Sequence, residues 1–182
     1  MNINKIVSKV KESILKDGCH HPTIIVEFED EREAIVLIDD YPADGHKKHM
    51  MFFTAGRKVG AEIKLEVRDL CLISEAWLSR AMEGGQPKYD RPSLDPNKKE
   101  AIIISRIQIM PGPDKPQMVQ SLTSYEMLRD GSGELVDLLK YAEFKDGVNN
   151  QLLTYFLSGI VSAEYSDKQL MDMLASMGSS EK

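Results

Sequence analysis

Segments of high β propensity follow one another in runs along this chain, and they do not alternate with helical segments. Residues 23–28 and 34–38 are separated only by a charged turn, and residues 101–110 and 117–128 only by a segment rich in proline and glycine. Parallel strands need long crossover connections, so consecutive strands favour antiparallel pairing. We therefore expect an α+β fold with a mostly antiparallel sheet, helices packed on one side of it, and two C-terminal helices.

Apolar residues recur at helical spacing in four segments, which we predict to be helices. Asn2 is placed to cap the first helix, Gly18 to end it, and Asp44 to cap the second. We divide the chain into an α+β domain, residues 1–146, and a C-terminal helical extension, residues 147–182, packed on the same core. The four predicted helices cover residues 3–15, 45–59, 147–163 and 167–177.

Two segments of the chain, one predicted strand and one predicted helix, carry more apolar surface than one buried face needs. Residues 35–38 are consecutive apolar residues, which predicts a strand covered on both faces. The helix at residues 45–59 is apolar both on the side of Phe52 and on the side of Phe53, so it is either sandwiched or presents one side to a partner. A homodimer formed by the C-terminal helices is a further expectation.

Charge and cysteine usage exclude some classes of protein. The 23 basic residues are outnumbered by 29 acidic ones, for a net charge of -6, which makes nucleic-acid binding unlikely. Cys19 and Cys71 do not form a disulfide framework or a metal knuckle, so a reducing cytoplasm is the expected location. We find neither a signal peptide nor an apolar run long enough to span a membrane.

The first candidate site lies around the lone tryptophan and the loop that follows it. Residues 82–99 contain paired glycines, three prolines and no apolar period, and ordered loops of this length are often functional. Tryptophan, tyrosine and arginine are enriched in binding centres. The predicted ligand-binding residues are Glu75, Trp77, Arg80, Tyr89 and Arg91. In the alternative interpretation Trp77 belongs to the core and the loop is fastened to it by Arg–Asp pairs.

The second candidate is a metal site, because all four histidines lie within the first 49 residues. His46 and His49 are three residues apart and share a helix face, and the turn before residue 23 supplies two more histidines. Aspartates at the preceding strand end provide oxygen ligands. The candidate ligands for Zn or Mn are His20, His21, His46, His49, Asp39 and Asp40. The alternative is that these are solvated histidines and ordinary turn aspartates.

No known catalytic motif accompanies these candidates. The sequence has no phosphate-binding glycine loop, no nucleophile elbow and no HExxH pair. We therefore expect a soluble, nonenzymatic binding or regulatory module whose partner is a protein or a small molecule. The alternative is a metal-dependent hydrolase that uses His46 and His49 with Asp39 or Asp40 to activate water.

Overall fold

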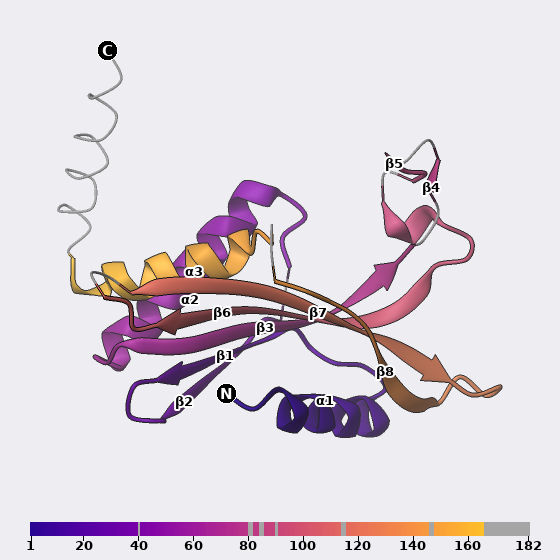
Figure 1. Ribbon diagram of the computed structural model, residues 1–182, viewed down its shortest axis with the longest axis horizontal. Helices are drawn as coiled ribbons and strands as arrows, with labels where there is room; N and C mark the ends of the chain where they lie inside the picture. Colours follow the sequence, from indigo (N-terminus) through magenta and orange to yellow (C-terminus); the bar gives the residue numbers. More distant parts are fainter. Residues whose placement is uncertain are drawn as a thin grey trace, which may run out of the picture.

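The computed structural model in Figure 1 contains one large sheet, three α-helices and a small two-stranded hairpin in its described residues. These are residues 1–39, 41–79, 82–83, 86–89, 91–113, 116–145 and 148–165. The expected helix at residues 167–177 lies outside them. The elements are α1 (Ile3–Asp17), β1 (Thr23–Phe28), β2 (Glu33–Leu37), α2 (Gly45–Glu62), β3 (Val67–Leu78), β4 (Met82–Glu83), β5 (Gln86–Pro87), η1 (Pro92–Leu94), β6 (Lys99–Met110), β7 (Gln117–Arg129), β8 (Leu135–Phe144), α3 (Gln151–Val161) and η2 (Ser162–Glu164).

The large sheet is antiparallel throughout, with the strand order β2-β1-β3-β6-β7-β8. This confirms the α+β class and the antiparallel pairing expected from the runs of strands. Chain reversals follow the predicted turns, and Gly133 adopts a φ of 89° between β7 and β8. At Arg68 the β3 strand has one residue more than its partner β1, which is a β-bulge.

The helices cover both faces of the sheet, so the expectation that they pack on one side is wrong. Adjacent residues of a strand point to opposite faces. In β3, Leu70 and Leu72 belong to a cluster with α2 and α3, whereas Cys71 and Ile73 belong to a second cluster with α1. We call these the upper and the lower face; Figure 1 shows α1 on one side of the sheet and the other two helices on the opposite side.

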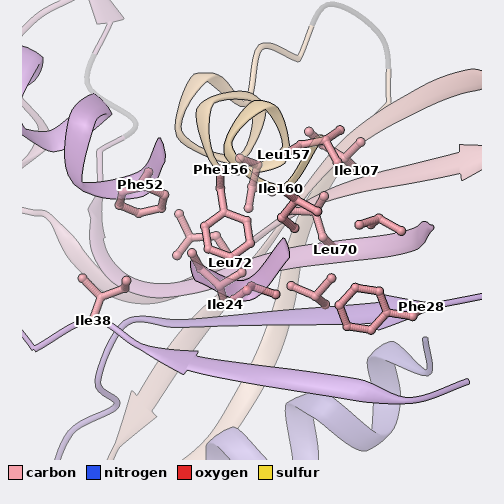
Figure 2. Close-up of a cluster of buried hydrophobic side chains, with 14 residues drawn as sticks. Ile24, Phe28, Ile38, Phe52, Leu70, Leu72, Ile107, Phe156, Leu157 and Ile160 are labelled. Carbon is pink, nitrogen blue, oxygen red and sulfur yellow. The ribbon is translucent and has the colours of Figure 1, made fainter. Parts of the chain in front are cut away.

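On the upper face α2 and α3 pack against each other as well as on the sheet. Figure 2 shows Phe52 of α2 and Phe156 of α3 in one apolar cluster with the strands beneath them. A Cβ atom built on Gly56 would lie 2.0 Å from the backbone oxygen of Phe156, and one on Gly159 would lie 2.1 Å from that of Phe53. The second apolar side of α2 is therefore a helix contact, in agreement with the sandwiched alternative.

α1 forms as its sequence predicts. The Asn2 side chain accepts a hydrogen bond from the Lys5 amide, and Gly18 ends the helix with a left-handed φ of 77°. Ile6, Val10 and Ile14 are buried against the lower face of the sheet. None of the helices in the described part of the chain combines the length and apolarity that a membrane span requires.

The strand β2 is an edge strand, and the prediction that it is covered on both faces is wrong. Its burial alternates: Ala34 and Val36 pack against the upper cluster, whereas Ile35 and Leu37 are 59% and 61% exposed on the lower face. The consecutive apolar residues at 35–38 therefore reflect a strand with one packed face and one open apolar face.

Candidate functional site

A groove of 540 Å³ runs along the lower face between α1 and the β1–β2 hairpin. α1 packs beneath the middle of the sheet and near β8, which leaves the β1–β2 end uncovered. The groove is lined by Met1, Asn2, Lys5, Ile6, Lys9, Val10, His20, Thr23, Ile25, Glu27, Glu31, Glu33, Ile35, Arg68 and Ile73.

The groove combines an apolar floor with walls of opposite charge. Ile25 and Ile35 face each other across β1 and β2 and form part of the floor. On the helix side, Lys5 and Lys9 are four residues apart on α1 and both line the groove. On the hairpin side the wall carries Glu31 and Glu33. This arrangement suits a ligand with an apolar body and charged groups of both signs.

A network of paired charges closes the groove at the amino end of α1. The Met1 amino group lies 2.6 Å from Glu27 Oε2 and 3.5 Å from Asp69 Oδ2, and Arg106 Nε donates to Asp69 Oδ1 over 2.9 Å. The hydrogen bond that Arg106 donates to the Asp69 carboxylate raises the pKa of Arg106. The ion pairs of the Met1 amino group with Glu27 of β1 and Asp69 of β3 hold the start of α1 against the sheet. Removing one partner would leave an uncompensated buried charge.

His20 lines the groove with an imidazole whose two nitrogens are buried and accept or donate no hydrogen bond among the described residues. Burial lowers the pKa of His20, and the neighbouring His21 lowers it further. The ring is therefore neutral at pH 7, with one nitrogen able to donate and the other able to accept. The backbone N–H of His20 donates to Glu75 Oε1 over 2.6 Å, which anchors the turn to β3.

The predicted ligand-binding residues do not gather in one place. Glu75 and Trp77 point to the lower face, since they alternate with Leu70 and Leu72 along β3. Trp77 is 42% exposed, with the Lys98 ammonium 4.9 Å from the centroid of its ring, so it is not a core residue. Arg80 lies outside the described residues.

Tyr89 lines a second pocket, of 450 Å³, together with Leu78 on the opposite side of β3 from Trp77. Arg91 is exposed at the start of η1. The end of the loop is fastened internally, because the Asp95 carboxylate accepts hydrogen bonds from the Ser79 hydroxyl and from the Asn97 amide. The other residues that line this pocket are Lys88, Asp95, Asn97, Lys99 and Tyr141.

The candidate metal ligands are also dispersed. His49 stacks on the ring of Tyr155 with centroids 4.4 Å apart, His46 is exposed on α2, and His20 lies in the groove. His21 is exposed and Asp39 is exposed at the end of β2, while Asp40 lies outside the described residues. Within the described ranges no three His, Cys, Asp or Glu side chains gather as metal ligands.

Sequence reasoning singled out His20 but missed the other residues that form the groove. Lys5 and Lys9 were part of an ordinary amphipathic helix, and Glu31 and Glu33 were part of a charged turn. The available signal was the run at residues 35–38, which is more apolar than an edge strand needs. Comparison of the chain with protein families, with curated proteins and with solved structures finds no match.

Proposed function

We propose that this protein is a binding module that holds an amphipathic ligand in the groove between α1 and the β1–β2 hairpin. The observation that carries the proposal is the apolar floor at Ile25 and Ile35, which opens to solvent between a lysine wall and a glutamate wall. An open apolar pocket with a few convergent polar groups is the usual form of a ligand site. Binding, with no chemical step, is favoured because the charged groups at the amino end of α1 are paired with one another.

The chemistry of the walls defines the ligand class. A ligand that lies on the floor of the groove has one side near Lys5 and Lys9 and the other side near Glu31 and Glu33. A short peptide segment with apolar side chains between an acidic and a basic side chain meets both walls.

A fluorescent probe with an apolar body and one negative charge, anilinonaphthalene sulfonate, tests the location and the role of the lysines. In an amide NMR titration we expect the largest shifts at Lys9, Ile25 and Ile35. The variant Lys9→Glu should weaken binding by about threefold or more, since it reverses one unit of charge at the wall.

The matched control is Lys16→Glu, which changes an exposed lysine of the same helix that does not line the groove. Its binding should equal that of the native chain. Shifts centred on Tyr89 and Tyr141 would place the probe in the pocket beneath the loop and would refute the groove as the binding site.

A further inference from the structure

The two edges of the sheet differ in how they are protected against pairing with another strand. Natural proteins protect edge strands with charged residues, prolines and bulges. β8 carries Asp137, Lys140 and Glu143, and its pairing with β7 is interrupted by two register shifts. These charged residues and register shifts oppose the pairing of β8 with a further strand.

β2 has none of these devices in its interior. Its sequence is Glu-Ala-Ile-Val-Leu, its register with β1 is unbroken, and its one charge is the first residue, Glu33. Ile35 and Leu37 stand exposed along it. An apolar, regular edge strand of this kind is a template for an added strand.

The hydrogen bonds of the hairpin determine which backbone groups of β2 face outward. The amide of Ile38 donates to Pro22 O over 2.8 Å, and the amide of Phe28 donates to Arg32 O over 2.9 Å. Backbone groups along an antiparallel strand alternate in direction. Ala34 and Val36 therefore bond to β1, whereas the N–H and C=O groups of Glu33, Ile35 and Leu37 point away from the sheet.

These outward positions are self-complementary. We propose that β2 pairs antiparallel with β2 of a second copy of this chain, about a twofold axis that passes between the two Ile35 residues. In this register Ile35 lies opposite its own copy, and Glu33 lies opposite Leu37 of the second copy. Each facing pair exchanges two hydrogen bonds, so every outward-facing backbone group of the strand is satisfied.

The pairing also continues both faces of the sheet. Ala34 and Val36 of the two copies extend the upper cluster, and the two Ile35 side chains become a cross-strand apolar pair on the lower face. Because Ile35 belongs to the floor of the groove, each copy extends the floor of the other. A second copy thus gives the exposed Ile35 side chain an apolar neighbour on the lower face.

One electrostatic consequence distinguishes this dimer from other associations. The antiparallel register brings the acidic turn that contains Glu31 toward Asp39 of the second copy, just past the end of β2. The carboxylates of the two copies repel each other, and dissolved salt screens this repulsion. We expect the dimer to tighten as the ionic strength rises.

Sedimentation equilibrium of the full chain tests the association. We expect a monomer–dimer equilibrium at concentrations up to about 0.1 mM. The variant Ile35→Lys places two ammonium groups opposite each other at the axis and should weaken the dimer by about tenfold or more. The matched control Leu139→Lys changes a residue of similar exposure, 57%, on β8 and should leave the dimer unchanged.

Cysteine cross-linking tests the register. In a hydrogen-bonded antiparallel pair the facing Cα atoms are about 5.5 Å apart, which suits a disulfide. Ile35→Cys should therefore cross-link readily under mild oxidation. Leu37→Cys should not, because its copy lies four residues, or about 13 Å, further along the partner strand. The native chain, with Cys19 and Cys71, provides the background.

Three results would overturn the proposal. The first is a native chain that stays monomeric over the whole concentration range at high and low salt. The second is a dimer that Leu139→Lys weakens as much as Ile35→Lys does. The third is equal cross-linking by Ile35→Cys and Leu37→Cys, which would show another register or another interface.

Discussion

The upper and lower faces of the sheet are built from the same strands, yet they are covered to different extents. Two helices cover the upper face, and glycines at their contact let the backbones of α2 and α3 approach closely. A single helix, α1, covers the lower face and leaves the hairpin end open. The groove therefore arises where helical cover ends, at the β1–β2 end of the lower face.

The largest expected change in the free energy of unfolding distinguishes the upper face from the lower face within the β1–β2 hairpin. Ile24→Ala removes a fully buried side chain from the upper cluster and should lower the free energy of unfolding by about 4 kcal/mol. Ile35→Ala, on the open lower face, should cost less than about 1 kcal/mol. Urea denaturation at low protein concentration measures both. Equal losses would contradict the assignment of an open lower face.

A smaller loss of stability is expected when a glycine at the contact between α2 and α3 is replaced. Gly56→Ala places a methyl group against the backbone of Phe156 and should lower the free energy of unfolding by about 3 kcal/mol. Gly45→Ala is the control, because nothing lies within 4 Å of its Cβ position at the start of the same helix. If both variants unfold at the same urea concentration, α2 and α3 are not in close contact.

The smallest expected effect is a dependence of the free energy of unfolding on pH, which arises from His20 on the lower face. Burial, and then His21, lowers the pKa of His20 below its ordinary value of 6.5, so the unfolded chain takes up a proton at higher pH than the folded chain does. The free energy of unfolding should therefore fall as the pH drops below about 6.5, until the folded pKa is reached.

The measurement compares urea denaturation at about pH 7.5 and pH 5 for the native chain and for His20→Gln, which cannot titrate. The native chain should lose more stability than the variant. His46→Gln removes an exposed histidine and should behave like the native chain. A native chain that loses no more stability than His20→Gln would show that the imidazole is not buried in the groove.

Local features of the fold were predictable because they depend on neighbouring residues. The caps at Asn2 and Asp44 form the expected hydrogen bonds, and Gly18 ends α1 as expected. The candidate sites were less predictable. Trp77 and Tyr89 are close in sequence, but strand alternation sends them to different sides of β3.

The sequence by itself determined the antiparallel α+β class, the start of α1 and α2, and the turns between consecutive strands, because periodicity and capping are local properties of the chain. Only the tertiary structure decided that α1 packs opposite α2 and α3, that β2 is an edge, and that lysines of a helix face glutamates of a hairpin. An apolar stripe records that a face is buried, but the same stripe fits either side of a sheet. The choice between the sides depends on contacts between residues far apart in the sequence, which the local pattern does not contain.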